Sequence, residues 1–172
     1  ERFDRGGIAV MVPCLERSGW SKMSGESHRC SMLRGLLICQ LGTRGCHMVE
    51  AKCQSLFNNW LGEAGEIESC EVEPGLREVV MKVAMASCPQ HQTLDSLLKL
   101  LDVPQERNRV LHSLGYSKNK DVLVRVLEFS LSPRLRDQEA VMVIESVCQN
   151  SLGVSIAWEF FREHIKEFLA RY

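Results

Sequence analysis

The chain has 172 residues, of which 45% are hydrophobic and 25% are charged, and its formal net charge is −1. These values are ordinary for one soluble globular domain or for a contiguous part of a larger one. The balanced charge argues against a nucleic-acid partner, because phosphate binding needs a clustered basic surface. The longest apolar run, residues 8–12, is too short to cross a bilayer, so we predict no membrane segment in this chain.

Apolar residues recur with a helical period along nearly the whole chain. Residues 8–12 are placed on a short helix, and longer helices are predicted over 30–41 and 46–60. Gly62 and Gly65 end the second of these, because glycine suits the left-handed position that follows a helix. The predicted buried faces are Cys30, Leu33, Leu37 and Leu41 on one helix, and Cys46, Val49, Cys53, Leu56, Phe57 and Trp60 on the other.

A polar connector with five glutamates, residues 63–73, follows. It could attract a basic partner, but a solvated connector is the preferred interpretation. Pro74 is expected to open the next helix, since the first turn of a helix needs no N–H from that residue, and Pro89 to close it. The expected buried face of this helix is Leu76, Val79, Val80 and Val83.

The second half continues the pattern. A leucine-rich helix covers residues 93–103, and another runs from Pro104 to Gly115. Ser117 is a suitable N-cap for a third, on which Asp121 and Arg125 have the spacing of an ion pair. The expected buried residues are Leu94, Leu97, Leu98 and Leu101, then Val110, Leu111 and Leu114, then Val122, Leu123, Val126 and Leu127.

Two helices are predicted after the break at residues 130–136. Asp137 is expected to cap the first, and the second runs without interruption over residues 154–172. The expected buried residues are Val141, Ile144 and Cys148 on the first, and Val154, Trp158, Phe161, Ile165, Phe168, Leu169 and Tyr172 on the second. Because that stripe continues to the last residue, an exposed apolar flank is also expected there.

These elements predict an all-α fold of about eight or nine helices joined by short turns, which makes neighbouring helices antiparallel pairs. Strand signals are nearly absent. The chain has no exact internal repeat, so a partial solenoid of diverged helix pairs is inferred from spacing alone.

Eight cysteines are spread along the chain without any C-x-x-C pair, at Cys14, Cys30, Cys39, Cys46, Cys53, Cys70, Cys88 and Cys148. Most fall on predicted apolar helix faces, as small buried thiols do. We therefore expect reduced, structural cysteines in a reducing compartment. A secreted disulfide scaffold is disfavoured, because a chain of this length can build a core without cross-links.

No motif for chemistry is present. The five histidines form no H-E-x-x-H helix, and neither a G-x-S-x-G elbow nor a phosphate-binding glycine loop occurs. We assign no catalytic, cofactor-binding or metal-ligating residue in this chain. A cysteine-dependent enzyme stays open as a third hypothesis, because a Cys–His pair need not be close in sequence.

Two further features have competing interpretations. Trp158, Phe160 and Phe161 could form a stacking platform, but the preferred interpretation buries Trp158 and Phe161 and leaves Phe160 at the margin of the core. Arg34 lies within an apolar helix and could line a cavity, as could Arg107 and Arg109. Long basic side chains usually lie along an apolar surface and expose the charge, which is the expectation here.

Short motifs occur in a fixed order: Leu-Glu-Arg-Ser-Gly-Trp at 15–20, Glu-Ser-His at 26–28, Met-Leu-Arg-Gly-Leu-Leu at 32–37, Pro-Gly-Leu-Arg at 74–77, Pro-Gln-Glu-Arg-Asn-Arg at 104–109, Ser-Pro at 132–133, Ala-Trp-Glu-Phe at 157–160 and Ala-Arg-Tyr at 170–172. Together they resemble the C-terminal helical domain of the M1 zinc aminopeptidases, most closely the puromycin-sensitive type. The likeness covers about residues 15–172. One departure is Asp-Gln-Glu at 137–139, where the family has Gln-Asp.

The resemblance implies a HEAT-like superhelix that closes over a catalytic domain and encloses a peptide chamber. It implies that residues 1–172 are part of a single C-terminal α-helical repeat domain, truncated at both ends and lacking the catalytic domain; the first residues, with no initiator Met, are consistent with this. The family's zinc ligands and its Gly-x-Met-Glu-Asn loop have no counterpart here.

By resemblance, the parent protein holds zinc and removes N-terminal residues from peptides. The implied partners are the N-terminal catalytic domain of the same polypeptide and peptide substrates. The implied location is cytoplasmic, with a membrane-anchored or ER-lumenal parent as the alternative. A stand-alone α-solenoid that binds a peptide or partner helix is the competing hypothesis.

Overall fold

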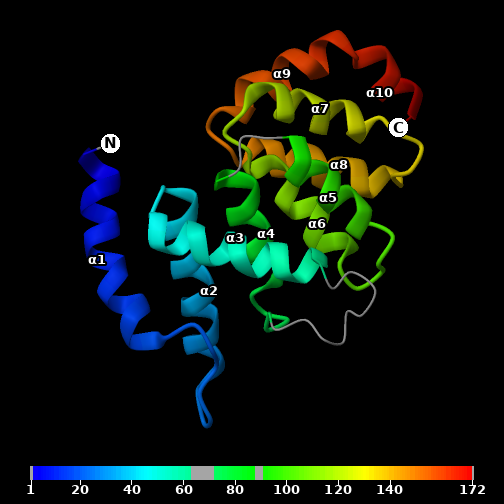
Figure 1. Cartoon of the computed structure of the whole chain (residues 1–172). Helices are drawn as coiled ribbons and strands as arrows, with labels where there is room; N and C mark the ends of the chain where they lie inside the picture. The colour runs from blue at the N-terminus through cyan, green and yellow to red at the C-terminus, as the bar shows by residue number, and fades with distance from the viewer. Residues whose placement is uncertain (1, 63–71, 88–90, 172) are drawn as a thin grey trace. The chain divides into compact units, whose positions relative to one another are not determined.

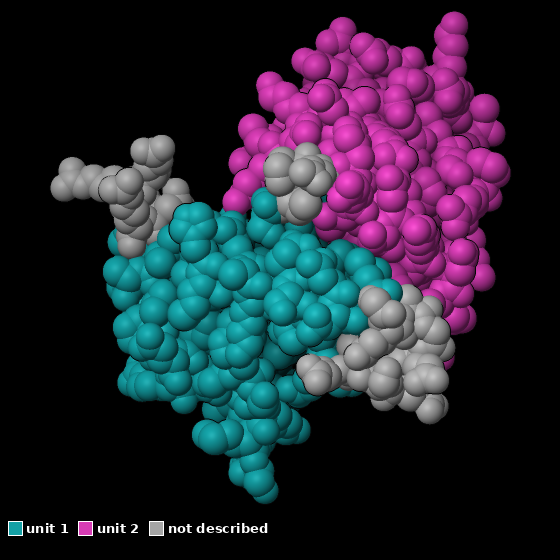
Figure 2. Space-filling view, in the orientation of Figure 1, with its two compact units in different colours: residues 1–87 teal, residues 88–172 magenta. Residues whose placement is uncertain are grey.

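The structure is a computed structural model that describes residues 2–62, 72–87 and 91–171. Within these ranges it contains ten α-helices and one short 3-10 helix and no strand, which confirms the all-α prediction. Contacts divide the chain into two compact units, residues 1–87 and 88–172 (Figure 2). The predictions on Gly65, Cys70, Cys88, Pro89 and most of the acidic connector lie outside the described residues.

Unit 1 contains four helices: α1 (Arg2–Ser18), α2 (His28–Thr43), α3 (His47–Gly62) and α4 (Arg77–Ser87). Helix α1 packs on α2, and α4 packs on both α2 and α3 (Figure 1). The core is formed by apolar side chains from all four helices, including Leu15, Leu37, Ile38, Leu41, Val49, Phe57, Trp60, Val80, Met81 and Val83.

A capping residue fixes the start of α2, and a glycine near its end allows close packing on α4. Ser27 caps its first turn by accepting a hydrogen bond from the Cys30 N–H, at 3.4 Å. At the other end, Gly42 faces α4 so closely that an added Cβ would come within 2.5 Å of the Val83 methyl groups. Because Gly42 has no side chain, the two helices approach at this point.

Some sequence predictions for unit 1 are confirmed and others are wrong. On α3 the predicted stripe is confirmed, with Val49, Cys53 and Phe57 fully buried. On α2 the buried face is rotated away from Cys30 and Leu33, which are exposed, toward Arg34 and Ile38.

The helix starts also differ from the prediction. Helix α4 begins at Arg77 and not at Pro74, because residues 74–76 form a turn in which the Leu76 N–H bonds the Glu73 carbonyl. Helix α1 is 17 residues long, much longer than predicted, and it tolerates Pro13 in its interior.

Unit 2 contains α5 (His91–Leu100), α6 (Arg107–Ser113), η2 (Leu114–Tyr116), α7 (Lys120–Ser130), α8 (Asp137–Cys148), α9 (Gly153–Glu163) and α10 (Ile165–Arg171). Helix α8 is central, because it packs against α6, η2, α7 and α9. Helix α9 lies along α7 and α8 and leads into α10 on one side of the unit (Figure 1).

Four hydrogen bonds hold α8, and Asn150 just after it, against residues 112–117. The Gly115 N–H donates to Ser146 Oγ at 2.8 Å, and that hydroxyl donates to the His112 carbonyl at 3.1 Å. The Asn150 amide donates to the carbonyls of Gly115 and Ser117. A Cβ on Gly115 would overlap the Ser146 backbone, so this packing requires glycine.

Arg171 fastens α10 to the connection between α7 and α8. Its guanidinium donates to the carbonyls of Ser130 and Leu135, at 2.9 and 2.6 Å. It also bonds Asp137 Oδ1 at 2.9 Å. One side chain therefore joins the last described helix to a segment more than 30 residues earlier.

Several predicted caps and pairs in unit 2 are wrong. Asn119, and not Ser117, caps α7 by accepting from the Asp121 N–H at 2.9 Å. Arg125 bonds Asp95 on α5 at 2.8 Å instead of Asp121. An extended Arg136 precedes α8, so Asp137 is its first residue rather than its cap.

The boundaries and buried faces differ as well. Helix α6 begins at Arg107 and not at Pro104, because residues 104–106 form a turn. On α8 the buried face is Ala140, Val143 and Val147, whereas Val141 and Cys148 are exposed. The long final helix is broken at His164 into α9 and α10.

Candidate functional site

Unit 1 contains a partly open cavity of about 540 Å³. Five segments form it: the connection between α1 and α2, helices α2, α3 and α4, and residues 72–76 before α4. The lining residues are Trp20, Ser21, Lys22, Ile38, Lys52, Leu56, Val72, Glu73, Pro74, Leu76 and Val80. A cavity of this size is in the range of sites that hold small molecules or short peptide segments.

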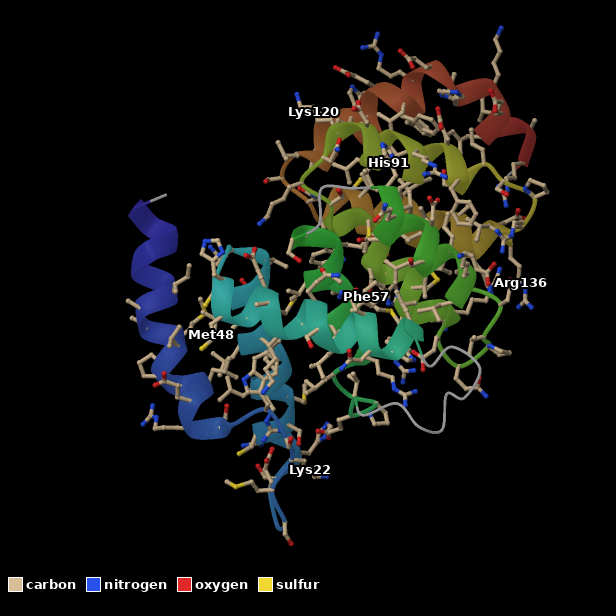
Figure 3. All side chains as sticks on the ribbon, in the orientation of Figure 1. Lys22, Met48, Phe57, His91, Lys120 and Arg136 are labelled. Atoms are coloured by element: carbon tan, nitrogen blue, oxygen red, sulfur yellow. The ribbon has the colours of Figure 1, made fainter. Side chains whose placement is uncertain are left out.

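The floor of the cavity is apolar. Ile38, Val72, Leu76 and Val80 are each less than 8% exposed. Charged groups stand at the rim, where Lys22, Lys52 and Glu73 contribute two positive charges and one negative charge. Lys22 lies on the connection between α1 and α2 (Figure 3). An apolar floor under a few polar groups is the usual composition of a binding site.

Lys52 is positioned by Trp20. Its Nζ lies 4.5 Å from the centroid of the indole ring, which is a cation–π contact. Within the described residues, neither Lys52 nor Lys22 has a carboxylate within ion-pair distance. Among the described residues, both ammonium groups are therefore available to an anionic ligand.

A buried arginine holds the wall that carries Trp20 and Lys22. Arg34 on α2 is 1% exposed and donates to the carbonyls of Ser18 and Gly19, both at 3.1 Å. Its Nη2 also bonds Glu26 Oε2. The expectation that Arg34 exposes its charge is wrong, because the carbonyls at the end of α1 and one carboxylate take up its donors.

Glu26 in turn organises the rest of that connection. It accepts hydrogen bonds from the Met23 N–H and the Ser31 hydroxyl, both at 3.0 Å. The hydrogen bond from Arg34, assisted by that of Met23, lowers the pKa of Glu26 to about 2. Glu26 is thus charged at neutral pH, and its ion pair with Arg34 fixes the residues on either side of Trp20.

The second notable surface is an apolar flank on unit 2, formed by α9 and α10. Its exposed side chains are Val154, Trp158, Phe161, Ile165 and Leu169, which we call the α9–α10 flank. Trp158 is 61% exposed and Leu169 is 76% exposed, and the rings of Trp158 and Phe161 stack at 6.2 Å. All five side chains were predicted to lie on the buried face of the last helix, and that prediction is wrong. The expectation of an exposed apolar flank on this helix is confirmed.

The predicted burial of Trp158 and Phe161 is wrong, because Phe160 takes the core position. Phe160 is 6% exposed and stacks on the His164 ring, with centroids 4.1 Å apart. Phe168 on α10 meets it edge-on at 6.4 Å. His164 Nδ1 also lies 3.0 Å from the Phe160 carbonyl, at the point where α9 ends.

The described residues do not fit a metal site. Nowhere in residues 2–62, 72–87 and 91–171 do three His, Cys, Asp or Glu side chains come together closely enough to hold an ion. In particular, the chain supplies no donor set for zinc within these ranges.

Three of the described cysteines have a raised pKa, which disfavours them as nucleophiles. The six described cysteines are free, and Cys53 is fully buried. Burial raises the pKa of Cys53 to about 12, and it also raises the pKa of Cys39 and of Cys148. A nucleophilic cysteine needs the opposite shift, so these three thiols do not support a cysteine-dependent enzyme.

Sequence reasoning did not find the cavity. Its charged residues come from three segments, with Lys22, Lys52 and Glu73 separated by 20 residues or more, and none belongs to a motif. The one available signal was Trp20, a large aromatic residue directly after the glycine that ends α1. None of the described helices has the length and apolarity needed to cross a membrane.

Comparison with known proteins places the chain among aminopeptidase domains. It is 27% identical over 91% of its length to "Aminopeptidase M1-A" of Oryza sativa subsp. japonica. It is 23% identical over its full length to "Endoplasmic reticulum aminopeptidase 2" of Homo sapiens, and 25% identical over 90% of its length to "Puromycin-sensitive aminopeptidase" of Caenorhabditis elegans.

The chain spans only 16–18% of the length of these relatives. The resemblance to the M1 aminopeptidases is therefore confirmed, for one part of such a protein. The sequence model of the ERAP1-like C-terminal domain matches residues 1–172, and the chain therefore belongs to that family.

Proposed function

We propose that the chain is a non-catalytic helical part of a zinc-dependent aminopeptidase that removes N-terminal residues from peptides. Both units would belong to one C-terminal, HEAT-like helical domain, and the catalytic domain would lie elsewhere in the same polypeptide. The observation that carries the proposal is the match of the whole chain to a C-terminal domain family whose relatives bear aminopeptidase names.

In this proposal the helical domain closes the substrate chamber over the catalytic domain and confines the peptide. The cavity of unit 1 offers a surface for peptide, and the α9–α10 flank offers a surface for packing against other polypeptide. Zinc and the hydrolytic chemistry are assigned to the rest of the parent, because the described residues do not supply metal ligands.

The test uses the parent protein and the 172-residue chain side by side. The parent should cleave amino acid p-nitroanilides and lose that activity on treatment with a chelator, whereas the chain alone should be inactive. The parent reading frame should also encode an H-E-x-x-H helix. A parent without that helix, or an inactive parent at full zinc occupancy, would contradict the proposal.

The alternative is a stand-alone helical module that binds a peptide or a partner helix. The α9–α10 flank favours the domain proposal, since a cluster of large exposed apolar side chains is typical of a surface that packs against other polypeptide. Purified chain that stays monomeric and unfolds in one cooperative step would favour the module.

A cytoplasmic location is proposed for the parent, in keeping with the free thiols. An ER-lumenal or membrane-anchored parent is the alternative, since one relative is named as an endoplasmic reticulum enzyme. Fractionation of cells with an antibody to this chain distinguishes the two.

A further inference from the structure

We propose that the cavity of unit 1 binds an acidic peptide segment, in which a large apolar side chain enters the floor and a neighbouring carboxylate binds Lys22 and Lys52. The inference deepens the proposed function, because it names a class of peptide and a site on the helical wall. It depends on this chain alone and not on the catalytic domain.

The floor selects the apolar part of the ligand. Ile38 and Val80 are each 1% exposed and Leu76 is 7% exposed, so the base of the cavity offers no unpaired side-chain polar group. A leucine or phenylalanine side chain would bury its surface there, whereas a polar side chain would lose its hydration without a partner.

The charged residues at the rim favour a ligand that carries a negative charge. Lys22 and Lys52 lack ion-pair partners among the described residues. The charges of the described lining residues, these two lysines and Glu73, sum to one net positive charge. A single carboxylate next to the apolar side chain complements this arrangement. The Glu73 carboxylate would accept a hydrogen bond from a backbone N–H of the same peptide.

The site is built before the ligand arrives. Lys52 Nζ is held 4.5 Å above the Trp20 ring, so its position is restricted. The backbone before Trp20 is fixed by Arg34, through the carbonyls of Ser18 and Gly19. Preorganisation of this kind reduces the entropy lost on binding.

The experiment measures binding to the full 172-residue chain by the indole N–H signals of its three tryptophans in ¹⁵N–¹H spectra. The probe is acetyl-Gly-Leu-Asp-Gly-amide. It should shift the Trp20 signal, identified from a Trp20→Phe variant, and leave the Trp158 signal unchanged. Trp158 lies in unit 2 and serves as the internal control, whereas Trp60 is one turn from the lining residue Leu56 and is not used as a control.

Two matched peptides separate the two parts of the recognition. Replacing Asp by Asn in the probe should weaken binding about tenfold, and replacing Leu by Gly should abolish it. At an ionic strength of about 1 M the Debye length is about 3 Å. The affinity for the Asp peptide should therefore fall, and the affinity for the Asn peptide should stay unchanged. Equal binding of the Asp and Asn peptides would overturn the proposal.

The matching protein variant is Lys22→Gln with Lys52→Gln, and Lys99→Gln with Lys120→Gln in unit 2 is its control. The first should lose about tenfold in affinity for the Asp peptide, and the second should lose nothing. Unchanged affinity in the first variant, or no shift of Trp20 at millimolar peptide, also contradicts the proposal.

The peptide comparison uses unaltered protein, so it decides the proposal even if a lysine variant unfolds. A negative result in the binding experiment rejects the peptide site and leaves the proposed function of the domain unaffected. The domain proposal is tested separately, by the chelator-sensitive activity of the parent.

Discussion

Arg34 carries its charge into the core of unit 1, where only 1% of the residue is exposed. Two backbone carbonyls and the Glu26 carboxylate surround the guanidinium. The burial could not be predicted from the sequence, because the partners are eight to sixteen residues away, on a connection without any periodic pattern. Sequence alone shows an arginine in an apolar helix, and such a side chain usually reaches water.

Replacing Arg34 by methionine is expected to destabilise unit 1 by at least about 1–3 kcal/mol, because the Ser18 and Gly19 carbonyls would lose their donor. Chemical denaturation of the two proteins measures the difference. Arg29→Met, on an exposed position of the same helix, is the control and should stay within about 0.5 kcal/mol of the wild type. Equal stability of the two variants would mean that the buried pair does not hold the connection.

Acid should weaken the fold through Glu26 and Glu139. Hydrogen bonds from Arg34 and from Arg107, respectively, lower the pKa of each carboxyl to about 2. A depressed folded pKa means that the stabilisation is complete above the unfolded value of 4.5 and is lost as the pH falls toward 2. Urea unfolding measured at several pH values from 6 to about 2.5 should therefore show falling stability, and Glu26→Gln with Glu139→Gln should flatten the curve. An unchanged slope in that double variant would contradict the assignment.

Helices α9 and α10 illustrate why a periodic pattern does not fix a buried face. Ala157, Phe160 and Phe168 form one apolar stripe, and Trp158, Phe161, Ile165 and Leu169 form another. Both stripes have helical spacing, so the period cannot choose between them. Packing on α7 and α8 selects the first stripe and exposes the second. Helix α3 was predicted correctly because only one of its faces is apolar.

Phe160→Ala and Trp158→Ala form a matched pair that tests this choice. Phe160→Ala should cost about 3–5 kcal/mol, since it opens a cavity beneath His164 and Phe168. Trp158→Ala should change the free energy of unfolding by only about 0.5 kcal/mol, because most of that side chain is in solvent. Thermal unfolding followed by circular dichroism measures the stability of both variants. If Trp158→Ala were the less stable of the two, Trp158 would be the buried residue, as the sequence predicted.

Gly42 tests the packing between α2 and α4. An added methyl group would overlap the Val83 side chain, so Gly42→Ala should destabilise the protein by about 1–3 kcal/mol, less the gain of about 1 kcal/mol in helix propensity. Gly6→Ala on α1 meets no neighbour and should stabilise the protein or leave it unchanged. If both alanine variants were equally stable, Val83 would have room to move aside.

At the scale of the whole molecule, two compact units each enclose their own core, and both fall within one family match. The all-α class could be predicted because helical period is present almost everywhere. The cavity and the true boundaries could not, because they depend on contacts between segments far apart in sequence. The α9–α10 flank exposes several large apolar side chains next to one another, which is uncommon on the surface of a soluble monomer.

The purified chain is therefore expected to self-associate. Light scattering should show a mass above that of the 19.5 kDa monomer at high protein concentration. Trp158→Glu with Leu169→Glu should restore the monomer, whereas Val10→Glu with Met32→Glu, exposed apolar positions of unit 1, should not. Monomeric wild-type chain at every concentration would support the stand-alone module instead.

The contacts of Arg171 have a mechanical consequence. A helix attached only along its side can peel away from one end under load, one turn at a time. Because Arg171 bonds the carbonyls of Ser130 and Leu135, a pull on the end of α10 also acts on the connection between α7 and α8. Several bonds must then break together, and α10 should resist tension better than its seven residues suggest.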